Sequence, residues 1–365
     1  MAAKQIAVLF TGGTIGSKNN NGKMSPQAGG AYTLIESYTN APDRRDVVFD
    51  TAQPLNVLSE NIVPDDWNTL MDALGGLDKS AYDGIIVTHG SDTLAYSAAM
   101  LSYLCCDTPV PIVLVAANYP LEDERSNGAS NFAAAIDFIA GESLPGVFVV
   151  YRNDRGESIV YLGTRITQCE SFTDQFGSPY SVPYGQMVEG RFVRNEHPYN
   201  PFTDELRGRG GAFSSPWQQG KSRLESGLLY IKPFSGIDYS YYDFSGARKP
   251  KAVLHDLYHS GTASANAPGS HSLLRFAEYC GTHGVDLYLC PLKDSSEALY
   301  ASSVSLIEAG VAFIENMSIE AALTKLTLTY SLLHADKEEI RDFVLNTSLF
   351  YEHIVPKQGR SEDNK

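Results

Sequence analysis

Short apolar runs alternate with longer amphipathic stretches through the first half of the chain. The runs are rich in β-branched residues and end at polar residues, Gly or Pro, so they predict buried strands at 6–10, 84–88, 111–116 and 146–151. The stretches between them carry apolar residues at helical spacing and predict helices at 64–75, 91–105 and 126–140. A strand followed by a helix, repeated, is typical of a mostly parallel sheet with right-handed crossovers.

From about Arg191 to Glu225 this pattern stops. The stretch is polar, rich in Gly and Pro, and has neither the helical nor the strand period, which predicts an extended connection between domains. The alternation then resumes, with strands expected at 227–234, 251–258, 285–292 and 310–317 and helices at 270–284, 295–310 and 318–335. The predicted fold class is α/β with two domains. A larger N-terminal domain at 1–190, whose mostly parallel sheet is flanked by helices, is joined through 191–225 to a smaller C-terminal α/β domain at 226–365.

The composition excludes some function classes. A length of 365 residues with 43% hydrophobic residues agrees with two domains, each around its own core. The formal charge of −15 argues against a nucleic-acid partner, because phosphate binding needs clusters of Lys and Arg. No stretch reaches the roughly eighteen apolar residues of a membrane span, and the start lacks the features of a secretory signal. The five cysteines form no CxxC pair, which is typical of free thiols in a reducing compartment, so we expect a cytoplasmic protein.

The first strand runs into a polar, glycine-rich loop, TGGT, at Thr11 to Thr14. Ligands of open α/β sheets bind outside the carboxyl ends of the strands, which is where this loop falls. Thr14 is a candidate nucleophile if a neighbour lowers its proton affinity, and the N–H of Gly13 is a candidate oxyanion donor. A glycine-rich turn after a strand also serves to bind phosphate or only to turn the chain, so this motif alone leaves the function open.

A second polar loop, THGSD at Thr88 to Asp92, follows the strand at 84–88. Ser91 is a good helix N-cap, and Asp92 in the first turn suits the helix dipole. From these residues alone, capping is favoured over catalysis. His89 is a candidate general base, although packing against the strand end explains it as well.

The two loops together resemble the two signature motifs of the bacterial-type L-asparaginases, TGGTIG at 11–16 and THGSDT at 88–93. Further matches follow in the same order. They are LSENIVPDDW at 58–67, RSNGASNF at 125–132, LLYIKPFSGID at 228–238 and MSIEAALTKL at 317–326. The similarity runs from about residue 5 to 335 and is closest to the cytosolic type I members.

The resemblance implies an amidohydrolase of two α/β domains that cleaves the side-chain amide of L-asparagine or a close analogue through an acyl-enzyme. It implies Thr14 as the nucleophile and Ser91 and Asp92 as its catalytic partners. Ser59 and Glu60 match the loop that binds the α-carboxylate and α-amino groups of the substrate. The expected substrate-binding set is Gly13, Ser59, Glu60, Gly90 and Gln168. The resemblance also implies a homodimer or homotetramer and no metal or organic cofactor.

The chain departs from the family at positions that handle protons. The family's second hydroxyl residue is usually Thr, and here it is Ser91. A family Lys falls on Gln168, or on Cys169 if the alignment slips by one, and no Lys occurs between Lys79 and Lys221. Gln168 forms hydrogen bonds but cannot take up a proton near neutral pH.

The first loop departs as well. A Tyr that contacts the nucleophile in the family falls near Met24 in this chain. Lys23 and Tyr32 are the available substitutes, and the sequence does not choose between them.

Three hypotheses remain open on these residues. The first is an asparaginase, and the second is the same fold acting on a modified amide or imide. The third is a degenerate homologue that binds an amino acid without turnover. A metal site is not expected: His255 and His259 in HDLYH are spaced like ligands on one helical turn, but they follow a strand-like run and lack the glutamate of HExxH.

Overall fold

The computed structural model describes residues 3–13, 15, 17–20, 23–26, 30–42, 44–209, 215–217, 223–293 and 299–356. The chain divides into two compact units. The described residues of the first unit fall in 1–217, Leu349–Tyr351 and 355–356. Those of the second unit fall in 218–348 and Glu352–Ile354.

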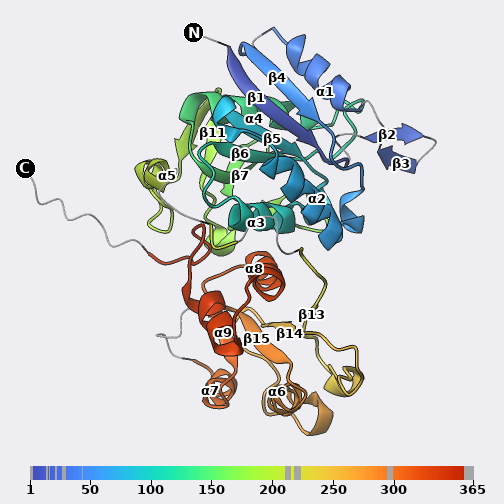
Figure 1. The fold of residues 1–365 in the computed structure, drawn as a ribbon, viewed down its shortest axis with the longest axis vertical. Coiled ribbons are helices and arrows are strands. Elements are labelled where there is room, and N and C mark those ends of the chain that lie inside the picture. The colour runs from blue at the N-terminus through green and yellow to red at the C-terminus, as the bar shows by residue number, and fades with distance from the viewer. Residues whose placement is uncertain are drawn as a thin grey trace, which may run out of the picture. The chain divides into compact units, whose positions relative to one another are not determined.

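The first unit is built on an eight-stranded sheet of order β12-β11-β8-β7-β6-β5-β1-β4. Five adjacent strands are parallel (Figure 1): β4 (Val47–Ala52), β1 (Lys4–Phe10), β5 (Gly84–Thr88), β6 (Pro111–Val115) and β7 (Gly146–Arg152). Three antiparallel strands extend this sheet beyond β7: β8 (Ser158–Leu162), β11 (Gly185–Val188) and β12 (Arg191–Arg194). The predicted α/β class with a mostly parallel sheet is confirmed.

Helices cover both faces of this sheet because alternate side chains of each strand point to opposite faces. Ile6, Val8 and Phe10 of β1 pack in one core with α1 (Gly30–Thr39) and α4 (Gly128–Glu142). Ala7 and Leu9 pack in the other core with α2 (Pro64–Gly75) and α3 (Leu94–Leu104). The parallel strands are therefore buried on both faces, which explains their continuous apolar runs.

Two short hairpins accompany the sheet of the first unit. One consists of β2 (Ser17–Asn20) and β3 (Lys23–Pro26), and the other of β9 (Thr167–Cys169) and β10 (Phe176–Gly177). The second hairpin carries Gln168.

The second unit contains a four-stranded parallel sheet of order β13-β14-β15-β16. Its strands are β13 (Leu228–Ile231), β14 (Ala252–Asp256), β15 (Asp286–Leu292) and β16 (Ala312–Glu315). Its helices are α6 (Leu273–Thr282), α7 (Ala301–Glu308), α8 (Ile319–Leu332) and α9 (Lys337–Asn346), arranged around this sheet (Figure 1). The expected second, smaller α/β sheet is present.

The stretch at 191–225 differs from the expected extended connection in its secondary structure. Its first part forms β12, which pairs with β11, and the short helix α5 (Thr203–Arg209). Leu206 of α5 is buried in a core of the first unit. A four-residue edge strand and a two-turn helix are too short for either period to stand out in the sequence.

The chain near its C-terminus also packs in the first unit. Phe350 is 1% exposed in the core that contains α1 and α4, and its carbonyl accepts a hydrogen bond from Thr164 Oγ1 at 2.7 Å. Gly146 leaves the space for this ring, because a Cβ there would lie 2.3 Å from Phe350 Cζ.

Candidate active site

Three loops meet at the carboxyl ends of β4, β1 and β5. The first follows β1 and contains Thr11 to Gly13, the second follows β5 and contains His89 to Asp92, and the third follows β4 and contains Val57 to Glu60. The first and third are joined by backbone hydrogen bonds from Val57 N to Thr11 O and from Gly13 N to Val57 O, both 3.0 Å. The structure thus brings the two motifs, about 75 residues apart in the chain, to one edge of the sheet.

Glycines allow these loops to approach closely. Gly13 has a φ of +72°, and a Cβ there would lie 2.5 Å from Gly90 N. A Cβ on Gly90 would lie 2.4 Å from Ser59 Oγ. Gly90 of the second loop therefore contacts Gly13 of the first loop on one side and Ser59 of the third loop on the other.

Ser59 and Asp92 are brought together by this packing. Ser59 is 3% exposed, and its hydroxyl donates to Asp92 Oδ2 at 3.4 Å. Thr93 Oγ1 donates to Ser59 O at 2.8 Å and fixes the third loop to the second. Asp92 itself is exposed, so its carboxylate is open to a ligand while one oxygen is held by Ser59.

Ser91 does not cap a helix, which corrects the interpretation that its residues favour on their own. Ser91–Thr93 form a 3₁₀ turn whose N-cap is Gly90, and α3 begins only at Leu94 with Thr93 as N-cap. Gly90 has no side chain to cap the turn, and the side chain of Thr93 makes no capping hydrogen bond to the backbone of α3. The half-buried hydroxyl of Ser91 is therefore not committed to capping.

Glu60 and Gln168 lie at the rim of the loops. Glu60 is exposed and belongs to the 3₁₀ turn Ser59–Asn61. Gln168 in β9 is exposed, and its Nε2 donates to the backbone carbonyl of Asp92 at 3.4 Å. The amide of Gln168 thus contacts the main chain of the second loop.

Cys169 is half-buried beside Gln168, and its Sγ lies 3.5 Å from Thr173 O. Burial, followed by the charges of Asp174, Asp92 and Glu170, raises the pKa of the Cys169 thiol to about 11. The thiol is protonated at neutral pH and does not supply a nucleophilic thiolate.

His89 is 1% exposed, and its Nδ1 lies 2.8 Å from Gly90 O. Burial lowers the pKa of His89, against the opposing effects of the Gly90 carbonyl and the Asp92 charge. A neutral, enclosed imidazole held by its own loop agrees with packing, and not with a general base open to substrate.

A polar network after β6 joins the RSNGASNF segment, which was singled out from the sequence, to Asn118 and Asp174, which were not. Asn118 and Asn127 each donate a backbone N–H to the other's side-chain oxygen at 3.0 Å. Asn118 Nδ2 also donates to Asp174 Oδ2 at 2.9 Å, and Asn131 Nδ2 donates to Ala116 O at 2.8 Å. The RSNGASNF segment is thus hydrogen bonded to the chain that follows β6. The available signal in the sequence was Asn118, the first polar residue after the apolar run of β6.

The predicted nucleophile Thr14 is outside the described residues, and so are the side chains of Lys23, Met24 and Tyr32. Their roles stay predictions.

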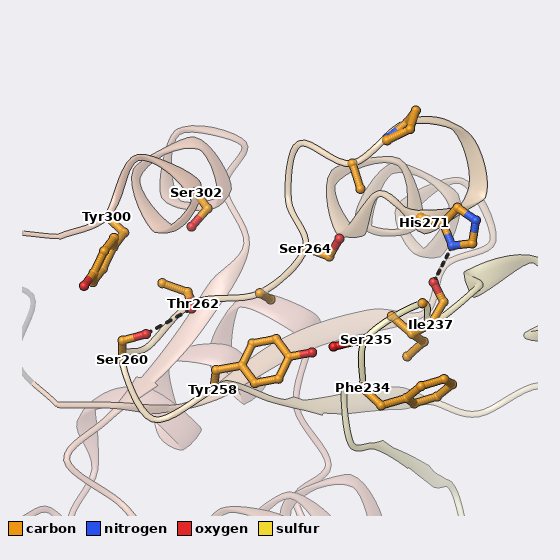
Figure 2. Close-up of a pocket in the computed structure, with 14 residues that line it drawn as sticks. Phe234, Ser235, Ile237, Tyr258, Ser260, Thr262, Ser264, His271, Tyr300 and Ser302 are labelled. Carbon is orange, nitrogen blue, oxygen red and sulfur yellow. Dashed lines mark hydrogen bonds between the residues drawn. The ribbon is translucent and has the colours of Figure 1, made fainter.

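A cavity of about 690 Å³ lies in the second unit, beyond the carboxyl ends of β13 and β14 (Figure 2). Its described lining is aromatic and hydroxyl-bearing: Phe234, Tyr258, Tyr300, Ser235, Ser260, Thr262, Ser264 and Ser302, with His271 at one side. His271 Nδ1 lies 2.7 Å from Ile237 O. No carboxylate, ammonium or guanidinium group is among the described lining residues.

His255 and His259 do not form a metal site. His255 lies in β14 and is fully buried; its Nε2 lies 2.9 Å from Tyr239 OH, and its Nδ1 2.5 Å from Asp256 O. Both ring nitrogens are thus used by the protein. Among the residues that the structure describes, no group of three His, Cys, Asp or Glu side chains could hold a metal ion. In the same part of the chain, no helix has the length and apolarity needed to cross a membrane.

Comparison with known families gives one match, described as "Asparaginase, N-terminal", over residues 5–199. L-asparaginase 1 of Escherichia coli is 27% identical over 350 residues, which cover 93% of this chain and 96% of that protein. A Methanococcus maripaludis protein, named as one subunit of glutamyl-tRNA(Gln) amidotransferase, is 26% identical over 341 residues, covering 88% of this chain and 75% of that protein.

Solved structures show the same fold. The thermostable L-asparaginase from Thermococcus kodakarensis superposes with a TM-score of 0.74, covering 97% of this chain and 99% of that one at 23% identity. The similarity therefore extends over both units.

Proposed function

Because the chain belongs to the asparaginase family, we propose that it hydrolyses the side-chain amide of L-asparagine or a close analogue, with Thr14 as the nucleophile. The observation that carries this proposal is the convergence of the three loops, in which Gly90 lies against Gly13 and also against Ser59, the hydrogen-bond partner of Asp92. Thr14 follows Gly13 in the chain.

In the proposed reaction Thr14 Oγ attacks the amide carbonyl and its proton passes to the polar groups of the second loop, Ser91 and Asp92. The N–H of Gly13, the oxyanion donor expected from the sequence, already donates to Val57 O at 3.0 Å. We therefore propose that another backbone N–H of the first loop stabilises the oxyanion of the tetrahedral intermediate. The C–N bond then breaks, ammonia leaves with the added proton, and an ester joins the acyl group to Thr14. Attack of water on this ester releases the acid and restores the hydroxyl.

Substrate recognition follows from the charges of the same loops. The exposed carboxylates of Glu60 and Asp92 favour an ammonium group. The Ser59 hydroxyl is the proposed contact for the substrate α-carboxylate, for which its O–H must turn from Asp92 to the substrate. Gly13, Gly90 and Gln168 complete the proposed binding set. We also propose a cytoplasmic homodimer or homotetramer that works without a cofactor.

Gln168 favours a modified amide or imide as the alternative substrate. Losing one proton-handling group costs about 10²- to 10⁴-fold in rate. A substrate with a better leaving group than ammonia would need less help at this position. The third hypothesis, an amino-acid-binding homologue, predicts that ligand binds and that neither type of substrate is turned over.

The name of the Methanococcus maripaludis relative favours a second candidate function. In that case the same site serves within a glutamyl-tRNA(Gln) amidotransferase made of more than one chain. Activity that requires a further chain would distinguish this candidate from a self-sufficient hydrolase.

The first test is ammonia release from L-asparagine by the purified full chain, with Thr14→Ala as the control. Turnover that disappears in the variant supports the proposal, and equal turnover in both proteins refutes it. A panel of substituted amides and imides then separates the two substrate classes. Thermal stabilisation by aspartate without ammonia release from any member of the panel would identify a binding protein.

A further inference from the structure

The side chain of Thr11 joins two loops of the proposed active site. Thr11 follows β1, is 2% exposed, and its Oγ1 donates to the carbonyl of Thr88, the last residue of β5, at 2.6 Å. Thr88 is 1% exposed. This distance is at the short end of the range for hydroxyl donors, and water does not compete for a hydrogen bond at this depth.

The backbone of Thr11 is held from the opposite side. Its carbonyl accepts from Val57 N at 3.0 Å, and two residues later Gly13 N donates to Val57 O, also at 3.0 Å. Thr11 therefore lies between the loop after β4 and the loop after β5. Its backbone binds the former and its hydroxyl binds the latter.

The loops beyond Thr11 leave no space for adjustment. A Cβ on Gly13 would lie 2.5 Å from Gly90 N, and one on Gly90 would lie 2.4 Å from Ser59 Oγ. Ser59 in turn donates to Asp92. A shift of the first loop relative to β5 is thus passed through Gly90 to the carboxylate that the proposed reaction uses.

We propose that Thr11 is a positioning residue, whose hydrogen bond to the Thr88 carbonyl holds the first loop at the distance from Gly90 and Asp92 that catalysis requires. This inference rests on the proposed function. Because its side chain is enclosed, Thr11 acts through its neighbours and does not touch the substrate.

Three variants of the full chain test this role. Thr11→Val keeps the shape and removes the donor, whereas Thr11→Ser keeps the donor. Thr164→Val is the matched control, because Thr164 Oγ1 makes the same kind of buried bond, 2.7 Å to Phe350 O, elsewhere in the first unit.

With L-asparagine as substrate, we expect Thr11→Val to lower kcat by about 10- to 100-fold and to change KM by less than about threefold, since small displacements of reacting groups cost this much. Thr11→Ser should retain kcat within about threefold. Thr164→Val should keep the wild-type kcat while its melting temperature falls about as much as that of Thr11→Val. Wild-type kcat in Thr11→Val, or an equal loss of kcat in Thr11→Ser or Thr164→Val, would overturn the proposal.

A second measurement does not depend on turnover. Amide hydrogen exchange at Gly13 and Val57 reports whether the first loop is held, because both amides are hydrogen bonded there. We expect exchange at both to rise by about tenfold or more in Thr11→Val and to stay unchanged in Thr164→Val. Unchanged exchange in Thr11→Val would refute the positioning role, whether or not the wild-type protein hydrolyses an amide. Absence of hydrolysis by the wild-type protein would refute only the proposed function.

Discussion

Replacing Gly90 by Ala should damage both the stability and the activity of this protein, for a steric reason alone. Gly90 has a φ of −85° and a ψ of 150°, which any residue adopts, so the backbone is not strained by a side chain. The added Cβ, however, would lie 2.4 Å from Ser59 Oγ and 2.6 Å from Ser59 Cβ.

The size of the effect follows from these distances. Ordinary van der Waals contact begins at 3.4 Å. The second and third loops must therefore separate by about 1 Å, and overpacking of this kind costs about 1–3 kcal/mol. A displacement of about 1 Å between reacting groups costs about 10²-fold in rate. We expect Gly90→Ala to lower kcat by about that factor.

Gly141→Ala is the matched control. Gly141 lies in α4, and a Cβ there meets no atom within 4 Å. The same substitution should therefore raise stability by about 0.5–1 kcal/mol, through helix propensity, and leave ammonia release unchanged. Urea unfolding and ammonia release measure both effects. A Gly90→Ala protein as stable and as active as wild type would refute the idea that the loops are locked by contact.

Three further outcomes are expected. Gln168→Lys puts an amine that can take up and release a proton near the backbone of Asp92, so ammonia release should rise by about 10²- to 10⁴-fold; an unchanged rate would show that residue 168 handles no proton. Lys325→Met removes one partner of a fully buried ion pair, Lys325 Nζ to Glu352 Oε1 at 3.1 Å, and should lower the free energy of unfolding by about 3–5 kcal/mol in urea titrations. The further change of Glu352 to Gln should recover most of that loss, and no recovery would count against an uncompensated charge as the cause. Burial lowers the pKa of His255 from 6.5 to about 4, so neutral His255 contributes stability that is complete above pH 6.5 and is lost as the pH falls toward 4, by about 3 kcal/mol. His255→Phe should flatten the stability profile between these pH values, and an unchanged profile would assign the acid sensitivity to other groups.

The sequence by itself determined the elements and their type. Continuous β-branched runs such as 84–88 must be buried on both faces, and the helical spacing of apolar residues between them requires crossover helices, so the α/β class followed from local patterns. The order of TGG and THGSD, each at a strand end, also predicted that both motifs lie at the carboxyl edge of the sheet. The strand β12 and the helix α5 were not predicted, because each is too short to show a full hydrophobic period.

Only the tertiary structure decided which atoms of those motifs meet. Serine is a residue type favoured at helix N-caps, yet Ser91–Thr93 form a 3₁₀ turn and α3 begins only at Leu94. The Thr11–Thr88 hydrogen bond joins residues 77 apart in the chain, and Phe350 enters the core of the first unit from near the chain's end. Such contacts depend on strand order and on the space left by individual glycines. The local period of apolar residues predicts only which face of an element is buried, so it predicts neither the strand order nor the space at a glycine.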